Sequence, residues 1–415
     1  MITTDSIFNI IEKPISGEWG KEPKESNAIR VIRTTNFTNR GKLDIENKEV
    51  VRREVDQNKI EKKKLMLGDI IIEKSGGSPT QPVGRVVYFN INSEEPILCN
   101  NFTSIIRVNP DKVSSKYLFY FMLYMHQLGV TKKYQNKTTG IINLKLDSYL
   151  KDTKIPLPSL EEQKRIVKIL EKASLLLDQR RQSLFKLESF LKSSFLSLAG
   201  PNAEHESIWK NYKIQELAYN QKGSMRTGPF GSDLKHSEFV DEGICVLGID
   251  NAVGNYFSWG ERRYITAEKY HKLKRYTVYP DDVIITIMGT TGRSAVVPHD
   301  IPTAISTKHL ATITLNKELA LPEYISYAIH SHPGILKQIS LQNKGAIMNG
   351  LNLGIIKNLE LKVPPIEVQK KFKEVYKKVE KMRVDIEVSE NYLKNLYNSL
   401  LQKAFNGELT KQKVG

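Results

Sequence analysis

The sequence predicts a mixed α/β (α+β) fold with a pseudo-two-fold internal repeat, in which two globular parts are each followed by a long helix. Three observations support this prediction. Short motifs recur in the same order in both halves, two long stretches have coiled-coil spacing, and short β-rich segments alternate with loops rich in glycine and proline. The chain has 415 residues, 40% hydrophobic and 26% charged, a composition typical of a globular protein of about two to three domains.

The repeat has a period of about 207 residues, which is too long for a solenoid and indicates a duplicated two-part unit. Its most extensive motif is Pro156-Leu-Pro-Ser-Leu-Glu-Glu-Gln-Lys-Arg-Ile166, which reappears as Val363-Pro-Pro-Ile-Glu-Val-Gln-Lys-Lys-Phe372. Shorter matches precede it in both halves: Gly68-Asp69 with Asp281-Asp282, Tyr117-Leu-Phe-Tyr120 with Tyr324-Ile-Ser-Tyr327, Gln135-Asn-Lys137 with Gln342-Asn-Lys344, and Asn143-Leu-Lys-Leu146 with Gly350-Leu-Asn-Leu353. The shared order is stronger evidence for duplication than any single match.

This repeat divides the chain into five segments. We predict a first globular part at residues 1–155, a first long helix at 156–200, a second globular part at 201–362, a second long helix at 363–408 and a tail at 409–415. Strands are expected in the first globular part at 29–33, 69–73, 84–89 and 103–108, and in the second at 244–247, 282–288, 294–297 and 311–315. One amphipathic helix is expected in each part, at 115–125 and 322–330.

Both long helices have start and stop signals. The first should begin after Pro158 with Ser159 as its N-cap, since a serine oxygen accepts from a free backbone N–H group of the first turn, and it should end before Gly200. The second should follow Pro365 and end near Asn406-Gly407. About 40 residues at about 1.5 Å each make a rod of roughly 60 Å.

Apolar residues recur along each long helix at alternating spacings of three and four. The stripes contain Ile166, Leu170, Ala173, Leu177, Leu184, Leu187, Leu191 and Leu198 in the first helix, and Phe372, Tyr376, Val379, Ile386, Leu393, Tyr397, Leu400 and Ala404 in the second. We expect the two stripes to pack on each other. If a two-fold axis relates the halves, the pair is an antiparallel coiled coil that separates the globular parts. In the alternative, each stripe docks onto its own globular part.

The charge balance favours a polyanionic partner. The chain carries 62 Lys and Arg against 46 Asp and Glu, a net charge of +16, and neutralising phosphates releases condensed counterions. The alternative is a lysine-rich composition without functional meaning. No apolar run is long enough for a membrane-spanning helix and residues 1–10 lack a signal-peptide pattern, so we expect a cytoplasmic protein without membrane association. Cys99 and Cys245 cannot form a Cys-x-x-Cys motif and suit a reducing compartment.

Motifs for catalysis are mostly absent from the sequence. It contains no Gly-x-x-x-x-Gly-Lys-Ser/Thr phosphate loop, no Asn-Pro-Pro-aromatic motif of amino-methyltransferases and no His-Glu-x-x-His zinc motif. The triplets Asp152-Thr-Lys154 and Glu360-Leu-Lys362 lie at matching places, and such triplets can hold Mg²⁺ in nucleases. We favour a structural role for them at the joint before each long helix. The chain is therefore predicted to be no enzyme and to have no metal site, with a metal-dependent DNA endonuclease as one alternative.

Binding chemistry is present in both halves. Glycine-rich loops bring backbone N–H groups close to phosphates, while Arg, Asn and Gln side chains can recognise base edges. The candidates in the first half are Lys74, Ser75, Ser78, Thr80, Gln81, Arg85, Tyr134, Gln135, Lys137 and Thr138. Those in the second half are Arg226, Ser232, Lys235, Thr290, Thr291, Arg293, Gln342, Asn343 and Lys344. Each residue taken alone could be a solvated loop side chain; the recurrence of the set in both halves favours nucleic-acid binding.

Several of these segments resemble one protein family. The Pro156–Ile166 motif resembles the segment that leads into the central helix of the specificity (S) subunits of type I restriction–modification systems, and Thr227-Gly-Pro-Phe-Gly-Ser-Asp-Leu-Lys235 resembles the first loop of their target recognition domains. Gly17-Glu-Trp-Gly20 and Ala404-Phe-Asn-Gly-Glu-Leu409 are also similar to segments of that family. The resemblance adds Gly228 and Phe230 to the DNA-binding candidates. The first half lacks a Gly-Pro-Phe-Gly loop, so we expect a different first loop there.

The resemblance implies a function without catalysis. Each target recognition domain would recognise one half of a bipartite, asymmetric site in double-stranded DNA, and the paired helices would set the spacing of the half-sites. The helices would also dock two DNA methyltransferase subunits, and restriction subunits would join through that core. The chain would bind no cofactor, since S-adenosylmethionine, ATP and Mg²⁺ belong to the partner subunits. A coiled-coil scaffold that does not bind DNA is a further alternative.

Overall fold

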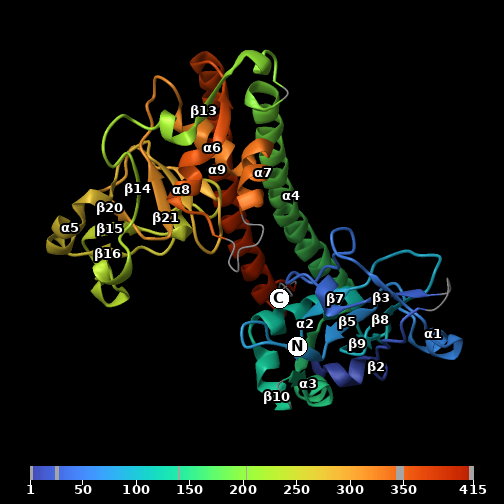
Figure 1. Ribbon diagram of the computed structural model, residues 1–415. Coiled ribbons are helices and arrows are strands. Elements are labelled where there is room, and N and C mark those ends of the chain that lie inside the picture. The colour runs from blue at the N-terminus through green and yellow to red at the C-terminus, as the bar shows by residue number, and fades with distance from the viewer. Residues whose placement is uncertain (1–2, 24–27, 139–140, 202, 343–349, 411–415) are drawn as a thin grey trace. The chain divides into compact units, whose positions relative to one another are not determined.

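The computed structural model describes residues 3–23, 28–138, 141–201, 203–342 and 350–410 (Figure 1). They form two compact units: unit 1 comprises Met1–Arg181 and Val388–Gly415, and unit 2 comprises Gln182–Glu387. Each unit contains one globular part and a portion of each of two 40-residue helices, α4 (Leu160–Ala199) and α9 (Ile366–Phe405). The predicted domain limits stay a prediction, since the unit boundaries fall inside these helices. Within the described residues no helix is long and apolar enough to cross a membrane.

Unit 1 contains small sheets and three helices shorter than α4. A four-stranded sheet has the order β2-β9-β5-β7, and a three-stranded sheet has the order β4-β3-β8, with β3 and β8 parallel. The hairpin β10–β11 pairs with β6, and β1 pairs with β12. The bounds are β1 Thr3–Ser6, β2 Ile15–Ser16, β3 Ile29–Ile32, β4 Val51–Arg53, α1 Gln57–Lys63, β5 Ile70–Glu73, β6 Ser75–Gly77, β7 Val86–Tyr88, β8 Ile97–Cys99, β9 Thr103–Ile106, α2 Ser115–Gln127, β10 Gln135–Thr138, β11 Ile141–Leu144, α3 Leu146–Asp152 and β12 Lys154–Leu157.

Unit 2 repeats this plan. Its sheets have the orders β14-β21-β18-β19 and β16-β15-β20-β17, with β15 and β20 parallel, and β13 pairs with β22 as β1 does with β12. The bounds are β13 Lys210–Lys213, β14 Met225–Thr227, β15 Ile244–Leu247, β16 Tyr264–Ile265, α5 Ala267–Leu273, β17 Thr277–Val278, β18 Val283–Thr286, β19 Ser294–Val296, β20 Ala304–Ser306, β21 Leu310–Ile313, α6 Pro322–Ser331, α7 Pro333–Gln342, α8 Leu353–Asn358 and β22 Glu360–Val363. The duplication, the predicted strands and the predicted helices at 115–125 (α2) and 322–330 (α6) are confirmed, whereas the expectation of a single such helix per half is wrong, since α1 and α3 in unit 1 and α5, α7 and α8 in unit 2 are further short helices.

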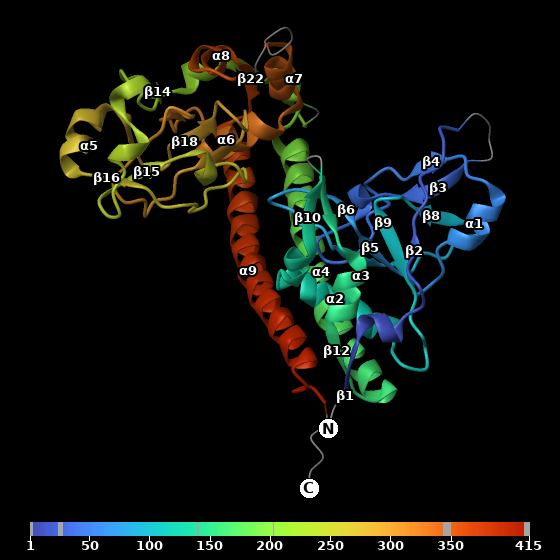
Figure 2. The same ribbon diagram turned by 90° about the horizontal axis from the view of Figure 1, so that it is seen from below.

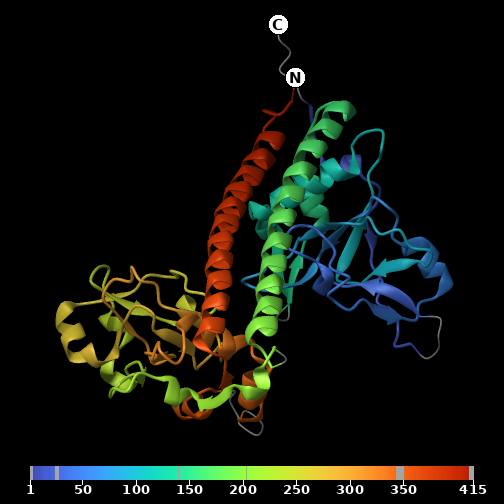
Figure 3. The same ribbon diagram turned by 90° about the horizontal axis from the view of Figure 1, so that it is seen from above.

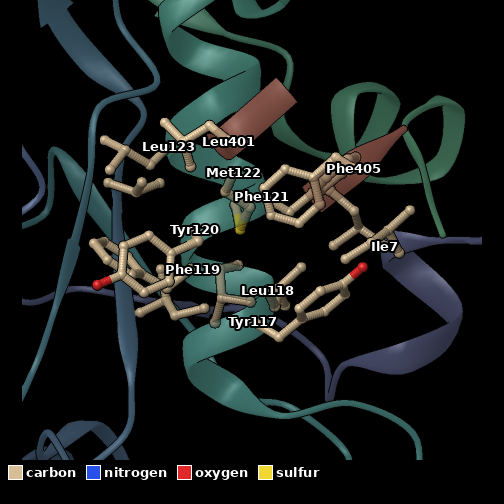
Figure 4. Close-up of a cluster of buried hydrophobic side chains, with 14 of the residues drawn as sticks. Ile7, Tyr117, Leu118, Phe119, Tyr120, Phe121, Met122, Leu123, Leu401 and Phe405 are labelled. Atoms are coloured by element: carbon tan, nitrogen blue, oxygen red, sulfur yellow. The ribbon is translucent and has the colours of Figure 1, made fainter. Parts of the chain in front are cut away.

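The core of unit 1 surrounds α2 (Figure 4). Residues 117–123 of this helix are all buried, because the sheet covers one side and the long helices cover the other. Phe405 of α9 points into this cluster, with its ring centroid 5.3 Å from that of Tyr117 and 5.2 Å from that of Phe121. Fully burying one such side chain stabilises the fold by about 1.5–3 kcal/mol. The cluster thus fastens the C-terminal turn of α9 to the first globular part.

The long helices pack on each other within each unit (Figures 2 and 3). In unit 1 the early α4 residues Leu170 and Leu177 share a core with the late α9 residue Leu401. In unit 2 the late α4 residue Phe195 lies 5.2 Å, centroid to centroid, from the early α9 residue Phe372. The predicted antiparallel pairing is confirmed. The hydrophobic core of each unit also includes residues of its globular part. Each apolar stripe of the long helices therefore packs on a globular part as well, as the alternative prediction stated.

The predicted helix ends agree with the observed ones. The Ser159 Oγ accepts from the Glu162 backbone N–H (3.3 Å) at the start of α4, which ends directly before Gly200. After α9, Gly407 has a φ of 82°, the left-handed conformation that closes many helices. The predicted stripe shifts in the last turns of α4, where Phe195 and Ala199 are buried instead of Ser194 and Leu198. A straight helix drifts from a seven-residue repeat, and Phe195 fills the aromatic core of unit 2.

Candidate nucleic-acid interface

Four segments of unit 1 meet beyond one end of its central strands. They are the loop at 17–20 after β2, the loop from Lys74 to Arg85 after β5, the turn at 100–102 between β8 and β9, and the hairpin β10–β11. The backbone N–H groups of Lys74 and Ser75 donate to the Phe102 carbonyl (2.8 and 3.2 Å), and the Leu144 N–H donates to the Lys74 carbonyl (2.8 Å). Loops held side by side at one end of a sheet form the kind of surface that carries binding residues.

The loops that follow β2 in unit 1 and β14 in unit 2 have glycines at the same two places. A Cβ added to Gly17 would lie 2.1 Å from the Asn100 carbonyl oxygen, and one added to Gly228 would lie 2.2 Å from the Ser306 carbonyl oxygen. Only glycine tolerates such an approach. Three residues later, Gly20 (φ 72°) and Gly231 (φ 60°) are both left-handed. Gly-Glu-Trp-Gly in unit 1 therefore matches Gly-Pro-Phe-Gly in unit 2 at both glycines, and the expectation of a different first loop stays a prediction.

The two loops differ in the aromatic side chain that they present. Phe230 in unit 2 is 53% exposed. Trp19, the third residue of the unit 1 loop, is half-buried and has the Arg53 guanidinium carbon 4.2 Å from its ring centroid. The exposed phenyl ring and the cation-covered indole offer different surfaces to a ligand. The shared backbone thus presents different chemistry in the two units.

Two of the predicted DNA-binding arginines form ion pairs inside their own units. Arg85 donates from Nε and Nη2 to the two carboxylate oxygens of Glu73, both at 2.8 Å, and its side chain is only 11% exposed. Arg226 donates from Nη2 to Asp282 Oδ2 (2.5 Å) and is 9% exposed. A guanidinium in such a pair has few donors left for a base. The role of these arginines in DNA binding stays a prediction, and their geometry suits a framework role.

Asp69 and Asp282 are the same buried aspartate in the two units. Asp69 accepts from the Met66 backbone N–H (2.8 Å), as Asp282 does from that of Tyr279 (2.9 Å). The compensating arginine comes from different strands: Arg107 follows β9 in unit 1, whereas Arg226 lies in β14 in unit 2. This explains the Gly-Asp and Asp-Asp motifs as structural elements, because a buried carboxylate needs a paired charge.

The other candidates of the loop after β5 differ in accessibility. Lys74 donates to Ser16 Oγ (2.6 Å), and partial burial lowers its pKa. Ser75 donates to Asn143 Oδ1 (2.6 Å) within the sheet. Ser78 Oγ accepts from the Gln81 N–H (3.0 Å) and lies 3.1 Å from Thr80 Oγ1, which orders the loop tip. Thr80 and Gln81 are exposed, so they are the two of these candidates with side chains open to a ligand.

The second polar loop of unit 1 is partly structural. The Tyr134 ring packs against Tyr149 in a T-shaped arrangement with the centroids 5.7 Å apart, and the Gln135 Nε2 donates to the Val83 carbonyl (3.5 Å). Lys137 and Thr138 lie on β10, and the structure does not describe their side chains. Tyr134 therefore contributes to the core, which sequence spacing alone did not indicate.

The unit 2 candidates are mostly exposed. Ser232 lies in the 3-10 turn that begins at Gly231, Lys235 precedes a second 3-10 turn, and Thr290 and Arg293 lie in the loop between β18 and β19. Thr291 in that loop is half-buried, and Gln342 ends α7 with its side chain exposed. Arg293 occupies the place of Arg85 but has Thr286 where unit 1 has Glu73, and no carboxylate of the described residues forms an ion pair with it. Asn343 and Lys344 lie outside the described residues.

Sequence reasoning missed the turns at 100–102 and 307–309. The Thr307 N–H donates to the Leu247 carbonyl (2.9 Å), and the His309 carbonyl accepts from the Ile287 N–H (2.9 Å), which places this turn beside the β18–β19 loop. Lys308 is exposed, and the turn lines a cleft of ≈ 700 Å³ together with Asp250 and Arg263. No motif marks these positions; only the strand pairing brings them to the interface.

The carboxylate–x–lysine triplets lie where the chain enters each long helix. Asp152 ends α3, and Lys154, Glu360 and Lys362 lie on the strands that lead into the long helices. The Lys362 Nζ pairs with Glu206 at 3.1 Å. Within the described ranges, no three His, Cys, Asp or Glu side chains gather into a group that could hold a metal ion. The triplets therefore lie at the joint before each helix, where a structural role was favoured.

Large apolar side chains are exposed on both long helices. In unit 2, Phe185 and Phe190 of α4 are 71% and 55% exposed. In unit 1, Val388 and Tyr392 of α9 are 64% and 69% exposed and lie one helical turn apart. Exposed apolar residues grouped along one element mark surfaces that bind other proteins. The long helices thus offer a second candidate surface, separate from the loops.

Comparison with known proteins identifies relatives of this architecture. A family model described as "Type I restriction modification DNA specificity domain" matches residues 2–188 and again residues 208–393. The specificity subunit of the type I restriction enzyme EcoBI of Escherichia coli is 26% identical over 346 residues, which cover 77% of this chain and 70% of that protein. The EcoKI specificity subunit of E. coli strain K12 is 23% identical over 411 residues, covering 92% and 83% of the two chains.

A solved structure has the same fold. The crystal structure of a type I restriction–modification system S subunit from M. genitalium superposes with a TM-score of 0.54 at 17% sequence identity. The alignment covers 98% of this chain and 96% of that one. Both globular parts and both long helices are therefore within the shared architecture.

Proposed function

The chain belongs to the family of type I restriction modification DNA specificity domains, and we propose that it is the subunit that gives a type I restriction–modification enzyme its DNA sequence specificity. The main observation behind this proposal is that the two units share one backbone framework but present different side chains on their loops. Gly17 and Gly228 hold the same backbone turn, while Trp19 and Phe230 differ. Each unit recognises one half of a bipartite site, and the half-sites differ because the presented side chains differ.

The charge of the chain supports contact with duplex DNA. A net charge of +16 attracts the phosphate backbone and makes affinity depend on salt. Exposed loop residues such as Gln81 in unit 1, and Lys235 and Arg293 in unit 2, supply donors for phosphates or base edges. Phosphate contacts position each unit on the duplex, and base contacts give the sequence preference.

The long helices dock the partner subunits. We place two DNA methyltransferase subunits on the exposed apolar side chains, with Phe185 and Tyr392 as anchors, and restriction subunits join through that methyltransferase core. The chain catalyses no reaction and binds no cofactor in this proposal. S-adenosylmethionine, ATP and Mg²⁺ are bound by the partner subunits, and the pair of helices keeps the two half-sites at a set spacing.

The test is selection of duplex DNA by the purified complex. The chain is co-expressed with a type I methyltransferase subunit from the same host, and the complex is mixed with a pool of random duplexes at two salt concentrations. The expected result is enrichment of a gapped, two-part sequence, with binding that weakens steeply as salt rises. Absence of salt-sensitive DNA binding would support the scaffold alternative, and Mg²⁺-dependent DNA cleavage by this chain alone would support the endonuclease alternative.

A further inference from the structure

The two units carry different side chains at one register-matched turn. In unit 1 the Asn100 N–H donates to the Ile32 carbonyl, and in unit 2 the Thr307 N–H donates to the Leu247 carbonyl, both at 2.9 Å. These bonds continue the parallel pairing of β3 with β8 and of β15 with β20. The turns therefore align residue by residue. Asn101 corresponds to Lys308, and Phe102 corresponds to His309.

The residues that lie beside this turn also differ between the units. Val31 pairs with Val51 in unit 1, whereas the equivalent Val246 donates its N–H to the carbonyl of Arg263 (2.9 Å) in unit 2. The buried asparagines that follow β3 and β15 match as well. Asn36 accepts from the Arg33 N–H (3.0 Å) and Asn251 from the Gly248 N–H (2.8 Å), which aligns Thr35 with Asp250. Unit 2 thus has Asp250 and Arg263 where unit 1 has Thr35 and Val51.

In unit 2 these residues line the cleft of ≈ 700 Å³. Arg263 Nη2 donates to Asp250 Oδ1, while Arg263 Nε, Asp250 Oδ2 and Thr307 Oγ1 are buried and have no hydrogen-bond partner among the described residues. Burial lowers the pKa of His309, and the neighbouring Lys308 and Arg263 add to this effect. The imidazole is therefore neutral at pH 7 and offers one donor and one acceptor. The exposed Lys308 and the half-buried His309 line the cleft beside this ion pair, and they suit a ligand that supplies both acceptors and donors.

We propose that this cleft is where unit 2 recognises base edges of its half-site, with Lys308 and His309 as specificity-determining residues. This inference rests on the proposed function. A lysine ammonium donates to guanine O6 and N7, so the unit 2 half-site contains guanine opposite the cleft. In unit 1, Asn101 offers the amide that pairs with adenine, and Phe102, 39% exposed, suits contact with a thymine methyl group. The unit 1 half-site therefore contains an A·T pair at the corresponding place.

The test exchanges the turn residues between units in the complex. The double variant Lys308→Asn/His309→Phe installs the side chains that the unit 1 framework already accommodates, and Asn101→Lys/Phe102→His is the reciprocal variant. Each is expressed with the methyltransferase, and methylated motifs are mapped by long-read sequencing. The unit 2 variant is expected to change one or two base pairs of one half-site, and the unit 1 variant to change the other half-site. The gap between half-sites stays the same in both.

A single variant and a control keep the inference testable if a double variant does not fold. Lys308 is exposed, so Lys308→Asn leaves the fold intact and is expected to lower methylation of the parental motif about 10-fold. The control Lys222→Asn removes an exposed lysine outside the cleft and leaves the motif unchanged. If the Lys308→Asn complex methylates the parental motif fully, or if both half-sites change, this inference is overturned and the proposed function is not affected. A wild-type complex without any gapped motif would instead overturn the proposed function.

Discussion

The Ser114 backbone N–H donates to Gln163 Oε1 (2.8 Å), which ties the first turn of α4 to the start of α2. The Nε2 of the same Gln163 amide donates to the Pro158 carbonyl (3.0 Å). Gln369 repeats this arrangement in unit 2, where it accepts from the Leu321 N–H (2.8 Å) and donates to the Pro364 carbonyl (2.9 Å). The repeated proline–glutamine motif is therefore a joint that fixes the direction in which each long helix leaves its globular part.

Replacing this glutamine should loosen the joint. Gln163→Ala leaves the partly buried Ser114 N–H and Pro158 carbonyl unpaired, and a fully buried group in that state costs about 1–3 kcal/mol, which is the upper bound here. We expect a lower Tm of the complex with the methyltransferase, measured by differential scanning calorimetry. Gln402→Ala, which shortens an exposed glutamine of α9, is the control and should leave Tm unchanged. Equal Tm values for both variants would show that Gln163 does not stabilise the joint.

A second prediction separates framework arginines from DNA-binding ones. Arg226→Ala leaves the fully buried carboxylate of Asp282 without its charge partner, and breaking a buried pair costs about 3–5 kcal/mol. The Tm of the complex should drop by several degrees. The control Lys272→Ala breaks the exposed ion pair with Glu268 and should change little. An unchanged Tm together with reduced methylation would assign Arg226 to DNA contact instead.

The stability of unit 2 should depend on Glu380. Burial raises the pKa of this carboxyl from 4.5 to about 7, which outweighs the attraction of Arg383, whose Nη1 lies 2.8 Å away. The folded protein therefore binds more protons than the unfolded chain between these two pH values. Since stability falls with pH wherever the folded state binds more protons, the free energy of unfolding should decrease by about 3 kcal/mol as pH rises through this window.

Glu380→Gln isolates this contribution. The amide does not titrate, so the variant should lose less Tm than the wild type between pH 5 and pH 8. His330 lines one cleft together with Glu380, distinct from the cleft at residues 307–309, and burial lowers its pKa to about 3, so its stabilising effect is lost as pH falls. The His330 contribution is the same in the wild type and in Glu380→Gln, so it cancels when their Tm changes are compared. Parallel Tm curves for the two proteins would rule out a raised Glu380 pKa.

Docking of the methyltransferase should depend on the apolar surface of the long helices. Phe185→Glu places a charge where a 71% exposed phenyl ring is expected to enter the partner, so methyltransferase should no longer co-purify with the chain. Ile208→Glu changes an equally exposed apolar residue, 81% accessible, in a short 3-10 turn outside the helices, and should leave co-purification intact. Retention of the partner by both variants would place the docking surface elsewhere.

The long helices could be predicted from sequence because their signals are local. Ser159, Gly200 and Gly407 act within one turn of each helix end, and the apolar stripe is visible in the spacing alone. The stripe shifted near the C-terminal ends of the helices, at Phe195 and Ala199 in α4 and at Leu401 in α9, where tertiary packing overrides the repeat. The order of the duplicated motifs likewise gave the repeat of the two units.

The loop chemistry could not be predicted in the same way because it depends on long-range pairing. The equivalence of Gly17 and Gly228 becomes visible only through the carbonyl oxygens that both approach. Arginine is a residue type that often contacts DNA, so the sequence indicated Arg85 and Arg226 as DNA-binding residues. The carboxylates that pair with them, Glu73 and Asp282, are 12 and 56 residues away in sequence. The turn at 307–309 carries no motif at all. Sequence therefore named candidate loops but did not separate their framework residues from the exposed ones.

The central claim is that this chain gives a methyltransferase its sequence specificity, and a genome-wide methylation map tests it most directly. Host DNA is sequenced by long reads with and without the gene for this chain, while the methyltransferase gene stays intact. We predict that one gapped, two-part motif loses its methylation on deletion and regains it when the gene is restored. A map that is identical in both strains, with the chain and the methyltransferase both expressed in the parent, would contradict the account.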